Sequence, residues 1–582
     1  MKNSFFIKLI ILVISVAVAV SVTGCKSNNA ESTSSYISSA EENVSSGEEQ
    51  LDSSEGEFPY DEEIYEEDDW EENEYDDSES AYFEETVTVR NASVPVEDDF
   101  LGLNNVYHCF TYINDEFGRN YTESQAQLEF NRLQNMGVKI VRTYYNEEYA
   151  FDAEKGEFNW ESDDMKAVYK WMLEMQKRGI SVACNTGWAI DGCYNKNYWV
   201  PWSASFVEGD IDTTIKNHAV WMAESLNQFR AHGINNIDYL VMFTEPGAND
   251  EKMGKENVEK LKATNIEDSY NLEPHVDLWL KATRAIHNEL VKNGTRSLYK
   301  TVGPNCSRVR ESADPNTRME PLYYFAIKKA YDYIDIYSSH SYPLISSVAV
   351  DTVKDVVDNK YMLQERIDMA HNIGKKFWYD ETNLHGEGTG GNNIFNYSDE
   401  DIPFEGLHAG SYFADTMNRG VQNVLWWYLF DQQWPNNTTT NTDGFENGLH
   451  AYGYVPSLMH STIPQSAYYG VSLLTKYFGN NAKVYKTECE YEYFNAGTQQ
   501  DKNGNWSICI SNLENDEGRI SIEFEKNIGK QKFYRHVYKA GEIVATAKAE
   551  ILPYDKILST SGDRMVDIIP SNSVVVYTTV KD

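Results

Sequence analysis

The chain has 582 residues, which is enough for two or three domains. Its hydrophobic share of 41% and aromatic share of 13% can form a sizeable core, which excludes a wholly disordered protein. The formal net charge of −41, from 91 acidic and 50 basic residues, argues against nucleic acid as a partner. Phosphate backbones bind to concentrated basic surface, and no such concentration is found here.

The amino terminus has the three parts of a secretory signal. Lys2 and Lys8 supply the charged start, an apolar run covers Leu9–Val20, and small residues precede Cys25. A cysteine directly after such a cleavage site resembles the lipobox of bacterial lipoproteins. This resemblance implies that residues 1–24 are a lipoprotein signal peptide and that Cys25 carries the lipid anchor. An uncleaved N-terminal anchor is the alternative, and in either case we expect the body at the cell surface, attached to the membrane.

More than half of the negative charge lies in one segment. Residues 26–100 contain 26 Asp and Glu against two basic residues, Lys26 and Arg90, a net charge of −24. Polar residues dominate and apolar periodicity is lacking, so this stretch cannot offset the entropy of folding. We therefore predict that residues 25–95 form an acidic disordered tether, extended by repulsion between like charges. A specific role in calcium binding or adhesion is the alternative.

Between residues 96 and 480, short β-rich apolar runs alternate with helical patterns. The helical stretches Glu123–Met136 and Met165–Arg178 have apolar residues at i, i+3 and i+4, and a glycine follows each. Eight β-then-α units favour the α/β class with a parallel sheet, and eight are what a (β/α)8 TIM barrel requires. A doubly wound open sheet is the alternative, although no GxGxxG follows the first strand. The predicted strands are Phe100–Asn104, Lys139–Tyr144, Ser181–Thr186, Tyr239–Thr244, Lys300–Gly303, Ile334–Ser338, Lys376–Asp380 and Val424–Leu429.

The pattern changes to period two at about residue 481. Apolar and polar residues alternate in the runs, and turn residues separate them, which predicts a small antiparallel β-sandwich over residues 481–582. This domain is either a glycan-binding module or a packing partner of the barrel, and we favour the packing partner. The strands predicted in it are Trp506–Asn512, Arg519–Glu525, Lys532–Tyr538 and Ser573–Thr579.

Two carboxylates follow strands of the predicted barrel, at the end where barrel enzymes carry their catalytic residues. Strand four runs into Thr244-Glu245-Pro246, and strand seven ends in Asp380-Glu381-Thr382. Because they are three strands apart, Glu245 and Glu381 face each other across the barrel mouth. Such a pair can cleave a glycosidic bond, one carboxyl protonating the leaving oxygen while the other attacks or activates water. Since side chains alternate along a strand, we expect Asp380 to point away from Glu381 and to be structural.

The order and context of these residues resemble the clan A glycoside hydrolases, and the trailing sandwich resembles several families of that clan, including family 39. The resemblance covers roughly residues 96–480 and implies a retaining β-glycosidase without a cofactor. It implies that Glu245 is the acid/base and that Glu381 is the nucleophile. Arg142, near the end of strand two, resembles the arginine that hydrogen-bonds the nucleophile and keeps it ionised.

Further residues resemble those that hold the sugar in this clan. His340 and Tyr342 resemble the strand-six pair that lines the subsite of the cleaved sugar. Trp426, or its neighbour Trp427, resembles the strand-eight tryptophan beneath that sugar. Thr244 stands where the clan has an asparagine that binds the sugar 2-hydroxyl. Because threonine is shorter, this departure predicts either a substrate that differs at C2 or a weakened site.

The loop after strand three is rich in aromatic residues, and Trp188 is the first of them. Aromatic faces stack on the CH groups of sugars, so Trp188 is a predicted substrate contact, with packing of the loop onto the barrel as the alternative. The six cysteines after Cys25 are scattered without a CxxC pair or ligand spacing, so we expect no metal. Cys184 and Cys193 either pair or remain buried free thiols.

Together these patterns predict a lipid-anchored, extracytoplasmic retaining glycoside hydrolase that cleaves β-glycosidic bonds in an oligo- or polysaccharide. The first alternative is a catalytically weakened or inactive glycan-binding lipoprotein on the same barrel. The second is a solute-binding lipoprotein, which needs two α/β lobes joined by a hinge. The continuous eightfold alternation argues against two lobes.

Overall fold

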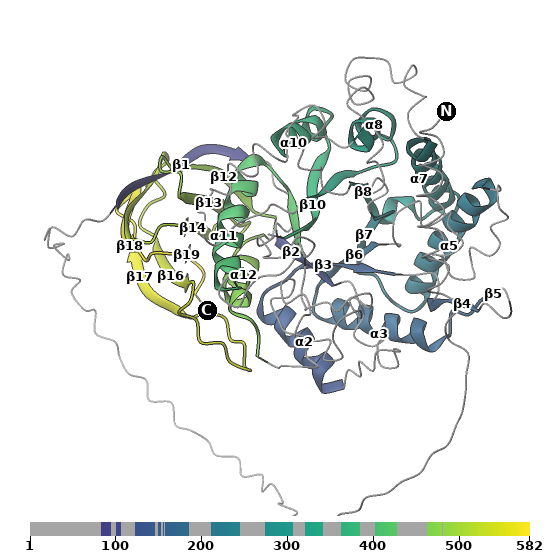
Figure 1. Ribbon diagram of the computed structural model, residues 1–582, viewed down its shortest axis with the longest axis horizontal. Coiled ribbons are helices and arrows are strands. Elements are labelled where there is room, and N and C mark those ends of the chain that lie inside the picture. Colours follow the sequence, from purple (N-terminus) through teal and green to yellow (C-terminus); the bar gives the residue numbers. More distant parts are fainter. Residues whose placement is uncertain are drawn as a thin grey trace, which may run out of the picture. The chain divides into compact units, whose positions relative to one another are not determined.

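The structure is a computed structural model of the chain, which divides into the units Met1–Ser78 and Glu79–Asp582. All described residues lie in the second unit, which contains a ring of strands surrounded by helices and a separate β-domain (Figure 1). No helix among them is long and apolar enough to cross a membrane. The described residues are 83–94, 101–105, 123–145, 149–152, 155, 157–185, 211–244, 274–306, 321–341, 363–383, 402–427, 463–479 and 481–581.

Eight parallel strands form a closed barrel and follow one another around the ring in chain order. They coincide with the eight predicted strands, apart from shifts of a few residues at their ends, so the predicted (β/α)8 TIM barrel is confirmed. The strands are β2 (Leu101–Asn105), β3 (Ile140–Tyr144), β6 (Ser181–Asn185), β7 (Ile237–Val241), β8 (Lys300–Cys306), β9 (Ile336–Ser341), β10 (Lys376–Thr382) and β11 (Asn423–Trp426).

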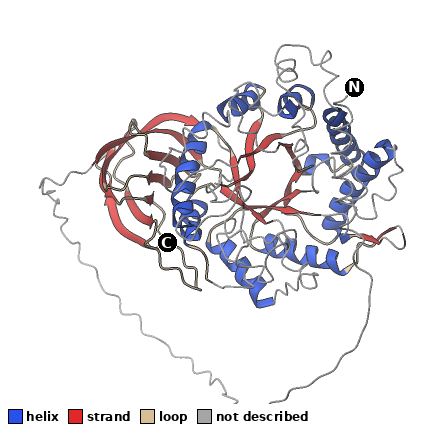
Figure 2. Ribbon diagram, in the orientation of Figure 1, coloured by secondary structure: helices blue, strands red, loops and turns tan. Residues whose placement is uncertain are grey.

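A helix follows each barrel strand and lies outside the ring (Figure 2). Gly137 and Gly179 follow α2 and α3 with φ of +71° and +68°, the left-handed conformation that ends a helix at little cost for glycine. The helices are α2 (Glu123–Asn135), α3 (Asp163–Lys177), α5 (Ile211–Ala231), α7 (Pro274–Lys292), α8 (Pro321–Lys329), α10 (Leu363–Asn372), α11 (Ile402–Arg419) and α12 (Ser466–Tyr477). Smaller elements are the hairpin of β4 (Phe151–Asp152) and β5 (Glu157–Phe158) and the 3-10 helix η6 (Arg296–Leu298).

A buried apolar layer fills the inside of the barrel. Seven strands contribute one side chain each to this layer, and β2 contributes Gly102 at the corresponding position. A Cβ on Gly102 would lie 2.5 Å from Cγ2 of Ile140 and 2.6 Å from its carbonyl oxygen, so only glycine fits. The layer therefore fills the barrel interior and supports the side chains that lie nearer to the carboxyl ends of the strands. Its members are Ile140, Ala183, Val241, Val302, Ile336, Trp378 and Leu425.

The β-domain is a nine-stranded sheet in the order β17-β16-β19-β14-β13-β12-β1-β15-β18. Its neighbouring strands pair antiparallel except for β1 and β15, and the β-domain has a hydrophobic core of its own, as expected for a β-sandwich. The strands are β1 (Phe83–Val94), β12 (Lys483–Glu488), β13 (Phe494–Gln500), β14 (Trp506–Asn512), β15 (Gly518–Phe524), β16 (Lys532–Lys539), β17 (Tyr554–Ser559), β18 (Arg564–Ile569) and β19 (Ser573–Thr578).

Strand β1 corrects one boundary of the predicted tether. Residues 83–94 were expected to be disordered, but they form a strand that pairs with β12 on one side and with β15 on the other. Val87 and Val89 are buried in the sandwich core, whereas Glu84 is exposed. This alternation is the reason that the segment folds despite its acidic composition. The rest of the predicted tether, residues 25–82, lies outside the described residues, as does the signal peptide.

Helices α11 and α12 join the barrel to the sandwich. Their side chains share one hydrophobic cluster with residues of the β-domain, such as Tyr538 and Val574. Gly410 of α11 faces Val574 of β19 so closely that a Cβ would overlap the valine side chain. This close approach is consistent with the expected role of the sandwich as a packing partner of the barrel.

The buried carboxylate of Glu85 anchors the connection between β12 and β13. It accepts hydrogen bonds from the backbone N–H groups of Glu490 and Tyr491, at 2.7 and 3.0 Å. We expect Glu85→Ala to lower the free energy of unfolding by about 1–3 kcal/mol, because two amides lose their acceptor. Glu84→Ala, which removes the neighbouring exposed carboxylate, is the control and should change stability little. Equal losses for the two variants in urea unfolding would contradict this role of Glu85.

Candidate active site

A polar layer lies above the apolar layer of the barrel, toward the carboxyl ends of the strands. Its members follow the apolar residues by two positions, as the alternation of a strand requires. Asn104 follows Gly102, Arg142 follows Ile140, and Asn185 follows Ala183 in this way. All three polar side chains are fully buried. Buried polar groups at strand ends of a barrel indicate a functional site rather than packing.

Arg142 and Glu381 form a buried ion pair at the centre of this layer. Nη1 of Arg142 lies 2.8 Å from Oε2 of Glu381, and the two side chains are 0% and 8% exposed. Tyr144 donates a hydrogen bond from its hydroxyl to the same Oε2, at 3.2 Å. Nη1 of Arg142 also donates to Oδ1 of Asn104 at 3.0 Å. Glu381 is thus held by a cation and a hydroxyl donor, both of which favour its ionised form.

The guanidinium of Arg142 keeps its charge in this buried position. Burial acts to lower the pKa of Arg142, but the neighbouring Tyr144, Glu381 and Asp380 outweigh it and raise the pKa above its ordinary value. A charged arginine beside a buried carboxylate favours the ionised form of that carboxylate.

Strand β10 is irregular at Asp380 and Glu381. The side chain of Asp380 points in another direction than predicted. Trp378 points into the barrel, so strand alternation also directs Asp380 inward. The pairing of β10 with both neighbouring strands shifts after Tyr379. A bulge of this kind re-aims side chains, and Glu381 points inward as well. The prediction that Asp380 points away from the site is therefore wrong.

Asp380 is tied into the polar layer through its side chain and its backbone. Its Oδ2 accepts a hydrogen bond from Nδ2 of Asn305. Its carbonyl oxygen accepts from Nη1 of Arg142 at 3.1 Å and from Nδ2 of Asn104 at 3.3 Å. Asp380 and Asn305 are both fully buried. The residue before Glu381 is therefore held by Arg142 and by two asparagines.

His340 lies opposite Glu381 in the register of β9 and β10. Its Nδ1 is 3.4 Å from Oε1 of Glu381, and its side chain is fully buried. The structure thus places His340 beside the carboxylate oxygen that faces away from Arg142. The predicted contact of His340 with the sugar stays a prediction.

Thr244 is buried at the end of the segment that follows β7. Its Oγ1 accepts a hydrogen bond from Nδ2 of Asn185, at 2.5 Å. The threonine that replaces the expected asparagine therefore has an asparagine beside it, contributed by the neighbouring strand β6. The chain places an amide and a hydroxyl together at this edge of the site.

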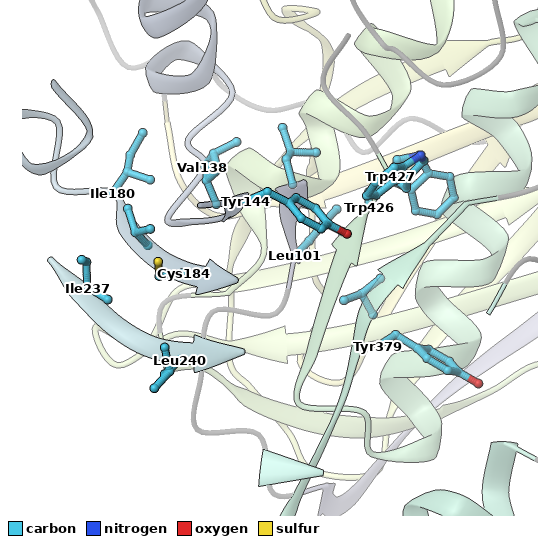
Figure 3. Close-up of a cluster of buried hydrophobic side chains, with 14 of the residues drawn as sticks. Leu101, Val138, Tyr144, Ile180, Cys184, Ile237, Leu240, Tyr379, Trp426 and Trp427 are labelled. Atoms are coloured by element: carbon cyan, nitrogen blue, oxygen red, sulfur yellow. The ribbon is translucent and has the colours of Figure 1, made fainter. Parts of the chain in front are cut away.

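The two tryptophans at the end of β11 have different surroundings. The ring of Trp426 meets that of Tyr412 of α11 edge-on, with centroids 6.1 Å apart, so it belongs to the interface between barrel and helices. The ring of Trp427 meets that of Tyr144 edge-on at 6.2 Å, and Tyr144 projects toward it (Figure 3). The predicted sugar contact of Trp426 is corrected accordingly, because Leu425 points inward and alternation then directs Trp427, not Trp426, to the site.

Several predicted residues lie outside the described part of the chain. These are Glu245, Tyr342, Trp188 and the lipid-anchor residue Cys25. Within the described ranges, no group of three or more His, Cys, Asp and Glu side chains could hold a metal ion. The thiol of Cys184 is free and buried, which agrees with the second of its two expected states.

Sequence reasoning missed four residues of the site: Asn104, Tyr144, Asn185 and Asn305. The first three lie within or next to predicted strands, at the ends where functional side chains of a barrel are expected. A systematic reading of the polar residues at all eight strand ends could therefore have found them. Asn305 lies beyond the predicted end of its strand, Gly303, because β8 continues to Cys306.

The sequence matches no protein-family model and no curated protein sequence. Solved structures share its fold at low identity. The catalytic domain of GH30 xylanase C from Talaromyces cellulolyticus is 12% identical, with a TM-score of 0.53 over 85% of this chain and 100% of that one. The GH51 arabinofuranosidase from Xanthomonas axonopodis pv. citri is 12% identical, with a TM-score of 0.53 over 85% of this chain and 99% of that one.

The alpha-L-arabinofuranosidase from Thermotoga maritima is 14% identical, with a TM-score of 0.51 over 85% of this chain and 99% of that one. At such identities the likeness establishes the fold, a TIM barrel with a β-sandwich. These neighbours are clan A glycoside hydrolases of families 30 and 51, in line with the clan resemblance of the sequence. The finer resemblance to family 39 stays a prediction.

The buried ion pair generates a prediction for stability. Arg142→Met removes the guanidinium that lies 2.8 Å from the Glu381 carboxylate, and we expect the free energy of unfolding at pH 7 to fall by about 3–5 kcal/mol. Without the guanidinium, burial favours the neutral form of the Glu381 carboxyl in the folded protein. The folded protein then takes up a proton as pH falls, so the deficit should be smaller at pH 5 than at pH 7.

The control is Arg90→Met, which removes a 42% exposed arginine from its ion pairs with Glu488 and Glu525. Exposed ion pairs contribute little, so its unfolding curve should stay close to that of the wild type. Denaturant unfolding at the two pH values measures both variants. A deficit of Arg142→Met that is equal at pH 5 and pH 7 would show that charge is not the reason for it.

Proposed function

We propose that the protein is a retaining glycoside hydrolase that cleaves β-glycosidic bonds in an oligo- or polysaccharide. The observation that carries this proposal is the carboxylate of Glu381, paired with Arg142 and hydrogen-bonded by Tyr144 at the carboxyl end of the barrel. The fold shared with glycoside hydrolases of two families supports the same conclusion, by analogy.

In the first step, an oxygen of the Glu381 carboxylate attacks the anomeric carbon of the sugar. The bond from this carbon to the glycosidic oxygen breaks, and the proton of the Glu245 carboxyl passes to the leaving oxygen. The products are an ester between Glu381 and the sugar, the free alcohol, and the Glu245 carboxylate. For this step Glu245 has to begin protonated, and the negative charge of Glu381 favours that state.

In the second step, the Glu245 carboxylate takes a proton from water while the oxygen of that water attacks the anomeric carbon. The ester bond to Glu381 breaks, and both carboxyl groups return to their starting states. Two inversions at the same carbon give net retention of configuration. Arg142 and Tyr144 favour the departure of Glu381 because they stabilise the carboxylate that forms.

The sugar bound at this centre is proposed to contact side chains from several strand ends. Trp427 takes the role first expected of Trp426 and supplies an aromatic face, which suits the CH groups of a pyranose or furanose ring. Thr244 and Asn185 together offer polar atoms near C2. Tyr342 and Trp188 remain proposed contacts from the sequence.

Azide rescue tests the two carboxylates separately. With a substrate panel of aryl β-glucosides and aryl β-xylosides, we expect Glu381→Ala to lose turnover, because no group attacks the anomeric carbon. Added azide should then restore a single displacement and give a glycosyl azide of inverted configuration. Glu245→Ala should lose about 100- to 10,000-fold in hydrolysis. Azide should rescue it with a product of retained configuration.

The control is Glu523→Ala, which removes an exposed carboxylate from the sandwich, and it should leave turnover unchanged. The stereochemistry of each azide is read by NMR. Turnover in Glu381→Ala equal to that of the wild type would refute the mechanism. Glycan binding without turnover in the wild type would instead favour the alternative of an inactive glycan-binding protein on the same barrel.

We also propose that the protein is a lipoprotein of the cell surface, held by lipid on Cys25 and separated from it by the acidic segment. The apolar run and the cysteine after it support this proposal. Cys25→Ser should move the protein from the membrane fraction to the soluble fraction and abolish labelling by a radioactive fatty acid. Membrane retention of this variant, together with no fatty-acid labelling of the wild type, would favour the uncleaved N-terminal anchor.

A further inference from the structure

Two consecutive carboxylates of β10 lie against one imidazole. Nδ1 of His340 is 3.4 Å from Oε1 of Glu381, and Nε2 of the same ring is 3.8 Å from Oδ1 of Asp380. The His340 and Asp380 side chains are fully buried, and that of Glu381 is 8% exposed. Each ring nitrogen of His340 therefore faces a different carboxyl group in a place that excludes most water.

The charge of this cluster depends on His340. Arg142 supplies one positive charge, whereas Asp380 and Glu381 supply two negative charges. A buried charge without a compensating partner is strongly unfavourable. Protonation of His340 makes these four groups neutral in sum, and both ring nitrogens then carry a proton near a carboxylate oxygen, at 3.4 and 3.8 Å. Geometry and charge balance thus favour the same state, an imidazolium.

The contacts of Asp380 leave one of its two carboxylate oxygens available to His340. Its Oδ2 is occupied by Asn305, and its backbone carbonyl is fixed by Arg142 and Asn104. Its Oδ1 has no hydrogen-bond partner among the described residues. A buried carboxylate oxygen without a donor is unusual, and Nε2 of His340 faces it.

We propose that Asp380 is a positioning residue, whose carboxylate holds His340 protonated and directed at Glu381. The inference rests on the proposed function for one point, the role of Glu381 as nucleophile. Glu381 loses its negative charge when it forms the ester with the sugar, so His340 then loses one of its two anionic neighbours. Asp380 keeps the charge and the orientation of the ring until water releases the sugar and restores the Glu381 carboxylate.

The charged and titratable groups around His340 come from the strands packed beside β9 and across the barrel. Strand β10 contributes Asp380 and Glu381, and β3 contributes Arg142 and Tyr144. On its other side, β9 pairs with β8, where Cys306 lies opposite Ser339 and belongs to the hydrophobic cluster around the barrel. Among the described residues, the two carboxylates and Arg142 are therefore the charged groups of the cluster around His340.

The variant Asp380→Asn removes the charge but keeps the shape, and its amide oxygen can still accept from Asn305. We expect the titration midpoint of His340, followed by NMR with isotope-labelled histidine, to fall by about 1–3 pH units. The His340 signals are assigned by their absence in His340→Gln. We expect kcat/KM at pH 7 to fall about 10- to 100-fold with KM little changed, and the loss to shrink toward pH 5, where solvent protonates the ring.

The matched control is Asp567→Asn in the sandwich. Asp567 is 1% exposed and is hydrogen-bonded by Arg535 and Lys556, so this variant also replaces a buried, paired carboxylate with an amide. It should lower the unfolding temperature without moving the His340 midpoint or the pH profile. An Asp380→Asn variant that behaves in the same way has only a structural defect, and this result would overturn the proposal.

Two readouts separate this inference from the proposed function. The NMR titration needs no substrate, so a wild type without turnover would refute the glycosidase and leave the His340 result standing. The wild-type titration is also decisive if Asp380→Asn does not fold. A His340 midpoint at or below the ordinary value of about 6.5 would overturn the role of Asp380, whatever the activity.

Discussion

The buried ion pair of Arg142 and Glu381 is the interaction on which the rest of the site depends. Two charges removed from water are tolerated only when each has close partners, and the surrounding side chains provide them. Asn104 and Tyr144 satisfy further polar atoms of the pair. The apolar layer beneath fills the barrel interior, and Trp378 is its largest side chain. This layer separates the ion pair from the other end of the barrel. The interior of the barrel is thus divided into a support and a reactive layer.

Much of the fold could be predicted from the sequence, because it depends on periodicity. The eight barrel strands and the helices α2 and α3 follow from the spacing of apolar residues, and the left-handed Gly137 and Gly179 end those helices as expected. Arg142 and His340 could be placed in the site because strand ends carry the chemistry of such barrels. These predictions concern local patterns, which a single sequence contains.

Two kinds of feature could not be predicted. One is the face of a strand on which a side chain lies, and the other is the pairing of a strand with partners far along the chain. That two consecutive residues, Asp380 and Glu381, both point inward requires the irregularity after Tyr379, which no residue pattern marks. Trp426 and Trp427 are the same residue type, so only the inward position of Leu425 distinguishes them. Strand β1 was missed because the residues before it are strongly acidic, although Val87 and Val89 alternate as strand residues do. Its partner strands β12 and β15 lie hundreds of residues away.

The position of β1 has a mechanical consequence. It is the first described strand after the acidic segment, and ladders of hydrogen bonds hold it on both sides. A pull on the amino-terminal end reaches β1 first and has to break its pairing with both β12 and β15 before β1 can leave the sheet. The sandwich therefore takes up tension before it can reach β2 and the barrel. In a protein tethered at its amino terminus, the catalytic geometry would be insulated from forces on the tether.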